Sequence, residues 1–348
     1  MSNVKVITPS RVHMALIDLN GNLGRIDGGI GLSLSNPGFS ITARKADHNE
    51  IICSPDIKQR AGKILDALKE KCGIDNVKIN IEKSIPFHSG LGSGTQLSLG
   101  IAQAACKLNG LEYSPQQLAY IVGRGGTSGI GVAAFSQGGF IVDGGHTFSD
   151  KKNNSEKTSY LPSSASKGVK PPPVIARYDF PEWDVLITIP NCKHISGDAE
   201  VKLFKTLCPM PLEEVQALSH IILMKLLPSL IQQELQPFGE AIDLIQTLAW
   251  KKVELQHQDP IVMEIMTFLR ENGGHGVGLS SWGPAVFCFG ENLAILQKRT
   301  REFLGNAKTG GTCFLTKANN TGTLIIEDEN GFYEDRSEKT DLQRAVYP

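Results

Sequence analysis

The stretch SIPFHSGLGSGTQLSLG, residues 84–100, decides how the chain is organised. Upstream of its glycines, residues 77–86 alternate like a half-buried strand, and downstream residues 97–108 have the apolar spacing of a helix. A glycine loop between a strand and a helix brings free amide groups and the positive end of the helix dipole to one place, where an anion can bind. The alternative is a turn that merely starts a helix, so other parts of the chain must decide.

Length and charge bound the possible functions. A chain of 348 residues is long enough for two domains with sizeable cores. The formal net charge of −1 gives no global electrostatic reason to expect nucleic acid or a membrane surface as a partner, and we expect neither. An anionic ligand must therefore be gathered locally.

Cysteines and hydropathy indicate the compartment. The seven cysteines include no CxxC pair, which favours reduced core residues over a disulfide framework or a zinc site. No signal peptide is recognisable at the N-terminus, and the most apolar run, residues 221–231, is broken by Lys225 and Pro228. We therefore expect a cytoplasmic protein without a membrane span.

A second dense segment runs from Pro9 to Leu34 (PSRVHMALIDLNGNLGRIDGGIGLSL). It is predicted to be a strand pair, yet it gathers more charged residues than a hairpin needs. Arginines suit phosphate recognition through their forked donors, and aspartates suit Mg²⁺ or sugar hydroxyls. The alternative is a set of exposed turn charges that pair with one another. The candidates are Arg11, His13, Asp18, Asn20, Arg25 and Asp27.

A third block, residues 123–146, has nine glycines in 24 residues. It cannot be a regular helix throughout, because each glycine costs ~1 kcal/mol relative to alanine in a helix. We expect it to form another backbone-rich wall of a site. Its polar candidates are Arg124, Thr127, Ser128 and Asp143. His146 is a weaker candidate, and the alternative is a surface residue whose hydrogen bonds are already made.

The remaining segments complete the predicted organisation. The polar stretch 149–170 predicts a flexible linker or excursion without a chemical role. Ser280, Ser281 and Trp282 are expected at the tip of a strand-turn-strand segment, and the charged end beyond Asp328 is expected to be loose. Strands are expected at 4–8, 77–86 and 183–190, and helices at 57–72, 97–108, 115–122 (capped by Ser114), 197–207 (capped by Ser196), 212–227, 238–256, 260–271 and 291–304. This order predicts an α+β protein of two domains, 1–178 and 179–348, whose three glycine-rich segments converge at the junction.

Taken together, the blocks resemble the GHMP superfamily of small-molecule kinases. Its P-S-R strand, P-x(3)-G-L-G-S loop and C-terminal glycine turn occur in order, at Pro9–Arg11, Pro86–Ser93 and Gly273–Pro284. Within the superfamily, the chain resembles the β-ribofuranosylaminobenzene 5′-phosphate synthase family more closely, from about Ile7 to Ile326. The six motifs of that family stand at Ser10–Gly21, Gly24–Gly31, Gly90–Gln96, Arg124–Gly131, Phe135–His146 and Ser280–Pro284.

The resemblance implies a GHMP-kinase-like fold, with an N-terminal domain like domain 2 of ribosomal protein S5 and a ferredoxin-like C-terminal domain. It also implies a transferase that joins phosphoribosyl pyrophosphate to 4-aminobenzoate, releasing CO₂ and pyrophosphate, at the start of tetrahydromethanopterin synthesis. Mg²⁺ or another divalent cation, no organic cofactor and a homodimer are the accompanying expectations.

Two departures from the kinase pattern favour this chemistry. Gly94 and Thr95 replace the usual serine and alanine of the phosphate loop, and residues 126–131, where many of the kinases place a catalytic aspartate, contain no carboxylate. An ATP-dependent small-molecule kinase remains the alternative. A ligand-binding protein without turnover is the third possibility.

By the same resemblance, the loop Gly90, Leu91, Gly92, Ser93, Gly94, Thr95 and Gln96 would hold pyrophosphate. Arg11 and Arg25 would hold phosphate or the benzoate carboxylate, and Asp18 or Asp27 would hold the metal or the ribose hydroxyls. His13 and Asp143 would act as proton or orientation partners. The catalytic candidates are thus Arg25, Asp27, Asp18 and His13, and the further substrate contacts are Ser10, Arg11, Asn20, Arg124, Thr127, Ser128, Asp143, Ser281 and Trp282.

Overall fold

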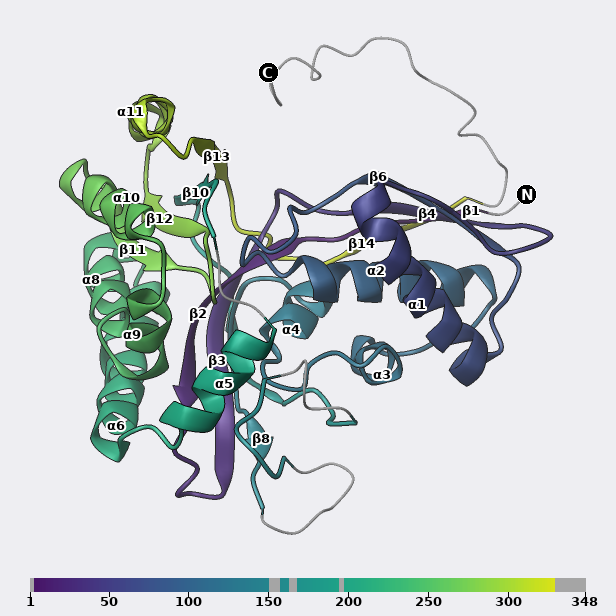
Figure 1. The fold of residues 1–348 in the computed structure, drawn as a ribbon, viewed down its shortest axis with the longest axis horizontal. Coiled ribbons are helices and arrows are strands. Elements are labelled where there is room, and N and C mark those ends of the chain that lie inside the picture. Colours follow the sequence, from purple (N-terminus) through teal and green to yellow (C-terminus); the bar gives the residue numbers. More distant parts are fainter. Residues whose placement is uncertain (1–2, 150–156, 163–167, 194–196, 329–348) are drawn as a thin grey trace.

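The structure is a computed structural model, and it describes residues 3–149, 157–162, 168–193 and 197–328. Two lobes lie on either side of a long hairpin formed by β2 (Ser10–Asp18) and β3 (Arg25–Leu34) (Figure 1). The lobe with α1 and α2 contains most of the first half of the chain, and the lobe with α8 to α11 contains most of the second half. The hairpin therefore carries its polar side chains to the boundary between the lobes.

The first lobe is a five-stranded sheet in the order β14-β1-β4-β6-β5, with α2 packed against β1 and β4 and α1 packed against α2. Helix α1 turns the side chains of Ile57, Ile64 and Leu68 inward, and it ends at Gly73 in the left-handed conformation, as a glycine C-cap does. The bounds are β1 (Asn3–Ile7), β4 (Ser40–Lys45), β5 (Glu50–Ile52), α1 (Pro55–Cys72), β6 (Val77–Lys83), α2 (Ser93–Leu108), α3 (Pro115–Ile121) and β14 (Leu324–Asp328).

The hairpin belongs to a second sheet, in the order β2-β3-β7-β9, with β8 paired to the beginning of β3. Strand β3 is buried from Ile26 to Leu34, and its glycines make room for a helix. A Cβ on Gly31 would lie 2.4 Å from Cγ2 of Ile130 in α4, so only glycine allows this close approach. The other bounds are α4 (Ile130–Ser136), β7 (Phe140–Asp143), β8 (His146–Thr147) and β9 (Val174–Tyr178).

The second lobe has a four-stranded antiparallel sheet in the order β11-β12-β10-β13. Helices α10 and α11 share a buried core with this sheet, and α8 packs against β11. The bounds are β10 (Asp184–Pro190), α5 (Asp198–Leu207), α6 (Leu212–Ile221), the π-helical turn η1 (Ile222–Leu226), α7 (Leu227–Ile231), α8 (Leu235–Ile245), α9 (Ala249–Gln256), α10 (Pro260–Glu271), β11 (His275–Leu279), β12 (Val286–Gly290), α11 (Ala294–Asn306) and β13 (Gly311–Thr316).

The predicted strand, glycine loop and helix around residues 84–100 are confirmed as β6, the loop and α2. The predicted single helix 238–256 is wrong: α8 and α9 are separate helices, because Leu248 is extended, with φ −118° and ψ 155°. The proposed cap at Ser196 and the end beyond Asp328 lie outside the described residues. The domain division at 178/179 stays a prediction, and β14 returns from the second half of the chain to pair with β1.

One helical run of the described residues, Leu212–Ile231, is long and apolar enough to cross a membrane by length and composition alone. It carries Lys225, which pairs with Glu240 of α8 at 2.7 Å. The expectation that the chain has no membrane span stays a prediction.

Candidate active site

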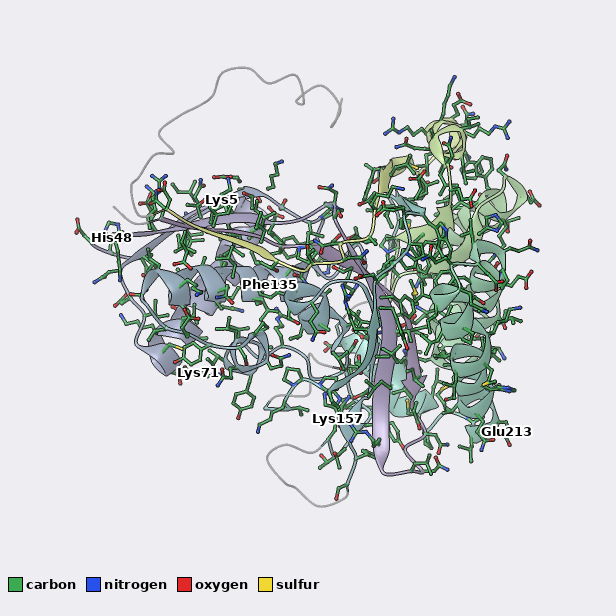
Figure 2. All side chains as sticks on the ribbon, turned by 180° about the vertical axis from the view of Figure 1, so that it is seen from behind. Lys5, His48, Lys71, Phe135, Lys157 and Glu213 are labelled. Atoms are coloured by element: carbon green, nitrogen blue, oxygen red, sulfur yellow. The ribbon has the colours of Figure 1, made fainter. Side chains whose placement is uncertain are left out.

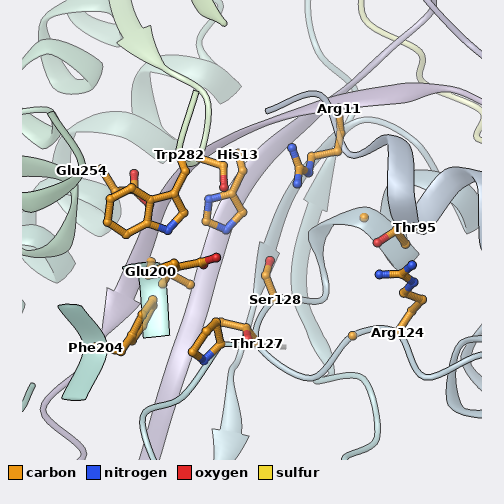
Figure 3. Close-up of a pocket in the computed structure, with 15 residues that line it drawn as sticks. Arg11, His13, Thr95, Arg124, Thr127, Ser128, Glu200, Phe204, Glu254 and Trp282 are labelled. Atoms are coloured by element: carbon orange, nitrogen blue, oxygen red, sulfur yellow. The ribbon is translucent and has the colours of Figure 1, made fainter. Parts of the chain in front are cut away.

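A cavity of about 220 Å³ lies where the hairpin, the glycine-rich loops and the second lobe meet. Figure 3 shows that its arginines and its aromatic rings lie at opposite ends. Arg11, Thr95 and Arg124 lie at one end, whereas Trp282, Phe204, Glu200 and Glu254 gather at the other, with His13 and Ser128 between them. The lining residues are Arg11, His13, Leu16, Thr95, Arg124, Gly125, Thr127, Ser128, Gly131, Pro162, Glu200, Phe204, Glu254, Ser281 and Trp282.

The cationic end is built on the glycine loop that precedes α2. Gly92, at the N-terminus of this helix, has φ +81°, and its missing side chain leaves space for the Arg11 guanidinium, because a Cβ there would lie 3.2 Å from Nε. Arg11 donates a hydrogen bond to the Gly90 carbonyl, while its Nε is buried with no partner in the described part of the chain. Burial lowers the pKa of Arg11 to about 10, so this side chain remains positively charged at neutral pH.

Arg124 stands opposite, next to the first turn of α2. Its Nε donates to the Ser98 hydroxyl at 3.1 Å, and a Cβ on Gly94 would lie 3.5 Å from its guanidinium nitrogens. The same arginine also borders a neighbouring cavity of about 150 Å³, together with Arg60 and Lys63. Two arginines and a helix N-terminus around one end of a cavity are a setting that favours an anion.

His13 lies on β2 in the middle of the cavity. Neither ring nitrogen has a hydrogen-bond partner among the residues that the structure describes. Burial, together with the positive charges of Arg11 and Lys251, lowers its pKa well below the usual value, so the ring is neutral at physiological pH. A neutral imidazole with both nitrogens unpartnered has one donor and one acceptor available to a ligand.

Asp143, at the end of β7, lies behind His13 and outside the cavity wall. Gly29 separates them: a Cβ there would be 3.1 Å from Oδ2 of Asp143 and 3.2 Å from Nε2 of His13. The Asp143 carboxylate accepts hydrogen bonds from the amides of Gly129 (2.9 Å) and Gly145 (3.0 Å). Burial nevertheless raises its pKa to about 7. Asp143 thus fixes the loop backbone rather than reaching the cavity.

Aromatic rings form the apolar wall. Trp250 of α9 is buried, and its ring centroid lies 4.1 Å from that of Phe204 and 5.9 Å from that of Trp282. Leu16 of β2 belongs to the same buried cluster. Because Trp250 supports both rings from behind, Phe204 and Trp282 are held at the cavity surface in a way that suits a flat aromatic ligand.

Two carboxylates, those of Glu200 and Glu254, lie beside the aromatic rings of the apolar wall. Glu200 precedes Phe204 by one helical turn on α5, and Glu254 follows Trp250 by one turn on α9, so each helix presents a ring and a carboxylate on one face. Glu254 forms a buried ion pair with Lys251, which also donates to the Leu279 carbonyl at 3.0 Å. Burial and the charge of Glu254 raise the pKa of Glu200 to about 7, despite a hydrogen bond from the Trp282 side chain.

The structure does not bring Asp27 into the cavity. Its carboxylate is fully buried, where it accepts bonds from Lys157 Nζ at 2.9 Å to each oxygen and lies 2.6 Å from Nδ1 of His146. The other ring nitrogen of His146 lies 3.0 Å from the Gly125 carbonyl. His146 is therefore a buried residue, and its interpretation as a surface residue is wrong. Figure 2 places Lys157 beside the β2 and β3 ribbons.

Lys157 also corrects the interpretation of residues 149–170 as a linker. The described part of this stretch is anchored by Lys157, and by Tyr160, whose hydroxyl donates to the Asn20 carbonyl at 2.6 Å. Pro162 then reaches the cavity wall. An excursion with a buried lysine and a residue lining the cavity contributes to the site.

The other hairpin candidates also lie away from the cavity. Arg25 donates to the carbonyls of Gly144 (2.8 Å) and Gly145 (2.6 Å), which occupies its guanidinium. The Asp18 carboxylate accepts hydrogen bonds from the backbone amides of Asn20 (2.7 Å) and Gly21 at the hairpin turn. The side-chain amide of Asn20 donates to the Met210 carbonyl. Ser10 is buried beside Arg11, and its hydroxyl has no partner among the residues described.

The phosphate loop has one cavity-lining side chain, that of Thr95. The other members shape the backbone: a Cβ on Gly90 would lie 2.2 Å from the Ser280 carbonyl oxygen, and the Gln96 amide donates to the Gly131 carbonyl at 2.7 Å. Of the predicted residues, the cavity therefore collects Arg11, His13, Thr95, Arg124, Thr127, Ser128, Ser281 and Trp282. It leaves out Ser10, Asp18, Asn20, Arg25, Asp27, Asp143, Gly90, Leu91, Gly92, Ser93, Gly94 and Gln96.

The predicted metal ligands do not fit a divalent cation. Asp27 is paired with Lys157, and Asp18 accepts hydrogen bonds from backbone amides at the turn of the hairpin. Within the described ranges, no group of three or more histidine, cysteine, aspartate and glutamate side chains has an arrangement that could hold a metal ion. Mg²⁺ therefore stays a prediction without an assigned protein ligand.

Two archaeal relatives match most of the length of this chain. Beta-ribofuranosylphenol 5'-phosphate synthase of Methanocaldococcus jannaschii is 42% identical to this chain, covering 91% of it and 98% of that protein. The protein of the same name from Methanothermobacter thermautotrophicus is also 42% identical, covering 92% and 98%. The chain belongs to the beta-ribofuranosylphenol 5'-phosphate synthase family.

This synthase family is built on a kinase-like fold, as expected. The sequence profile of the GHMP kinases N terminal domain matches residues 59–139. Among solved structures, L. major mevalonate kinase in complex with R-mevalonate gives a TM-score of 0.66 at 13% identity, covering 91% of this chain and 96% of that one. Homoserine kinase of Cytophaga hutchinsonii gives 0.63 at 17% identity, covering 93% and 97%. The predicted α+β GHMP fold is confirmed.

Sequence reasoning missed several cavity residues of this synthase. Glu200, Phe204 and Glu254 come from helices whose polar residues are typical of solvated faces. Lys251, the partner of Glu254 outside the cavity lining, has no motif around it. The one available signal was the repeated spacing of an aromatic residue and a glutamate four apart on two helices. Nothing in a single sequence shows that these two helices face each other.

Proposed function

We propose that this chain is a decarboxylating phosphoribosyltransferase that joins phosphoribosyl pyrophosphate to a 4-substituted benzoate, with release of CO₂ and pyrophosphate. The products named for the relatives are ribofuranosylphenols, so 4-hydroxybenzoate stands beside 4-aminobenzoate as the aromatic acid. The observation that carries the proposal is the polarity of the cavity, with cations at one end and an aromatic wall at the other. We also propose a place in tetrahydromethanopterin synthesis, a cytoplasmic location and a homodimer.

The cationic end accounts for the phosphorylated substrate. Departure of pyrophosphate leaves an oxocarbenium-like ribose, and fixed donors must stabilise the negative charge that develops on the leaving group. Arg11 has an unpartnered Nε, Arg124 lies across from it, and the first turn of α2 is close to both. These groups are in place before the reaction, so little reorganisation is needed as charge develops.

The aromatic end accounts for the acceptor. A benzoate ring that lies between Phe204 and Trp282 can direct its carboxylate-bearing carbon toward the ribose and its para substituent away from it. The ring carbon forms a bond to C1 of ribose as the bond to pyrophosphate breaks, and loss of CO₂ then returns an electron pair to the ring. His13, neutral and unpartnered, can hold the carboxylate with its N–H donor without adding a charge that would oppose decarboxylation.

The alternative of a small-molecule kinase needs a base near the transferred phosphate. Residues 126–131 contain no carboxylate, and the two cavity carboxylates, Glu200 and Glu254, lie at the end away from Thr95 and Arg124 (Figure 3). This arrangement favours the transferase. It leaves the acidic end of the cavity available for the aromatic substrate.

The test uses the purified chain, Mg²⁺, phosphoribosyl pyrophosphate and either carboxyl-labelled 4-hydroxybenzoate or 4-aminobenzoate. We expect labelled CO₂ and pyrophosphate in equal amounts, and neither product when phosphoribosyl pyrophosphate is left out. A parallel reaction with ATP and a panel of small alcohols tests the kinase alternative. Formation of ADP without labelled CO₂ would contradict the proposal, and absence of both products would favour a binding protein.

A further inference from the structure

Glu200 stands out among the cavity residues because it is a mostly buried carboxylate without a cation beside it. Glu254, its neighbour across the cavity, is compensated by Lys251. Glu200 forms no salt bridge within the described ranges, and its one identified donor is the Trp282 side chain. Burying a carboxylate costs free energy unless it is paired and hydrogen-bonded, so Glu200 is costly to the folded protein as it stands.

The position of Glu200 explains what would repay that cost. It precedes Phe204 by one turn of α5, and Trp282, the second ring of the aromatic wall, donates to it. A flat ring held by Phe204 and Trp282, with its carboxylate near His13, has its para position at the end of the cavity where Glu200 and Glu254 lie (Figure 3). The para substituents of both candidate acids carry a proton that a carboxylate can accept.

We propose that Glu200 recognises the para hydroxyl or amino group of the aromatic acid and accepts its proton during the reaction. This inference rests on the proposed function and adds a specificity-determining and catalytic residue to it. Glu254 serves a different purpose, because its carboxylate is already occupied by the ion pair with Lys251. The ligand class is thus a benzoate with a hydrogen-bond donor at the para position.

The chemical step balances without any additional reactant. As the para O–H or N–H proton moves to Glu200, its bonding electrons enter the ring, and the carbon that bears the carboxylate bonds to C1 of ribose. The bond from C1 to pyrophosphate breaks with its electron pair. Carbon dioxide then leaves, its bonding electrons restore the aromatic ring, and Glu200 returns the proton to the para oxygen or nitrogen.

The matched variants are Glu200→Gln and Asp198→Asn. Both residues are acids in the first turn of α5, but Asp198 is exposed and outside the cavity wall, so both variants remove one charge from the same helix end. Calorimetric binding is measured with 4-hydroxybenzoate and with 4-methylbenzoate, which lacks a donor. The wild type and Asp198→Asn should prefer 4-hydroxybenzoate. In Glu200→Gln the ratio of the affinities for 4-hydroxybenzoate and 4-methylbenzoate should fall by about 10- to 100-fold, as expected when a hydrogen bond to a charged acceptor is removed.

Turnover gives a readout that a purely structural role would not change. The rate of the wild type with 4-hydroxybenzoate should rise as pH increases through about 7, where Glu200 loses its proton, and Glu200→Gln should be slow with no such rise. The other ionisable side chains that line the cavity are Arg11, Arg124, His13 and Glu254. In that range both arginines stay protonated and His13 stays neutral, and Glu254 is paired with Lys251.

The outcomes separate this inference from the proposed function. If the wild type releases CO₂ and Glu200→Gln matches it in both preference and pH profile, the role of Glu200 is wrong and the transferase stands. If the wild type neither binds nor converts either acid, the proposed function fails, and the role of Glu200 fails with it. Equal losses in Asp198→Asn and Glu200→Gln would also overturn the inference, because they would report a general effect on α5.

Discussion

Replacing Lys157 with methionine tests whether the excursion between the two halves of the chain is part of the folded site. Lys157 is 2% exposed and donates to both oxygens of Asp27 at 2.9 Å. Methionine keeps most of the length of the side chain but removes the charge. Breaking a buried ion pair on one side costs ~3–5 kcal/mol, because the remaining charge stays buried. Here Asp27 would retain His146 as its partner, so the lower part of this range is expected.

This loss of unfolding free energy corresponds to a measurable drop in Tm. An unfolding entropy of ~2.1 cal/mol/K per residue over 348 residues makes 3–5 kcal/mol equal to a drop in Tm of roughly 4–7 °C. Differential scanning calorimetry measures it, and Lys170→Met is the control, because Lys170 is an exposed lysine of the same stretch. Since Pro162 lines the cavity five residues after Lys157, the Lys157 variant should also bind substrate more weakly. Equal Tm values for the two variants, within about 1 °C, would refute the reasoning.

Two further predictions concern the charged groups of the site. Arg11→Met should weaken binding of phosphoribosyl pyrophosphate by about 10- to 100-fold in calorimetry. Arg25→Met should leave this affinity near the wild-type value, because Arg25 already donates to the carbonyls of Gly144 and Gly145. A larger loss of affinity in Arg25→Met than in Arg11→Met would place the phosphate site beside the hairpin turn instead. Burial raises the pKa of Glu200 in the folded protein to about 7 from its ordinary value of 4.5, so the folded protein loses stability as pH rises between those values, by at most about 3 kcal/mol. The Tm of Glu200→Gln relative to wild type should therefore rise between pH 5 and pH 8, and a constant difference would contradict this.

The sequence predicted the residues at the arginine-lined end of the cavity better than those at the aromatic end. The glycine loop could be recognised because a strand, closely spaced glycines and a helix follow one another, and Thr95 lies in the cavity as expected. Arg11 and His13 were found because the segment Pro9–Leu34 is dense in charged residues and glycines. As alternate residues of β2 they share one face. Local patterns of this kind depend on neighbours in the chain.

The charges of the hairpin turn could not be assigned from the sequence. Arg25 and Asp27 look like Arg11 and His13 in a list of polar residues, but they stand at the other end of the β2–β3 hairpin. There backbone carbonyls accept the hydrogen bonds of Arg25, and Lys157 pairs with Asp27. Lys157 itself lies in a stretch whose composition is typical of a linker. The acidic end depends on α5 and α9 facing each other, which follows only from tertiary packing. Glu200 and Glu254 therefore appeared only in the structure.

Release of labelled CO₂ from carboxyl-labelled 4-hydroxybenzoate and 4-aminobenzoate, in the presence of phosphoribosyl pyrophosphate, is the most direct test of a decarboxylating transferase. We expect CO₂ to appear in a one-to-one ratio with pyrophosphate for at least one of the two acids. We also expect that Arg11→Met and Glu200→Gln each reduce the rate, whereas Asp198→Asn does not. A protein that binds phosphoribosyl pyrophosphate but releases no CO₂ from either acid would contradict the central claim.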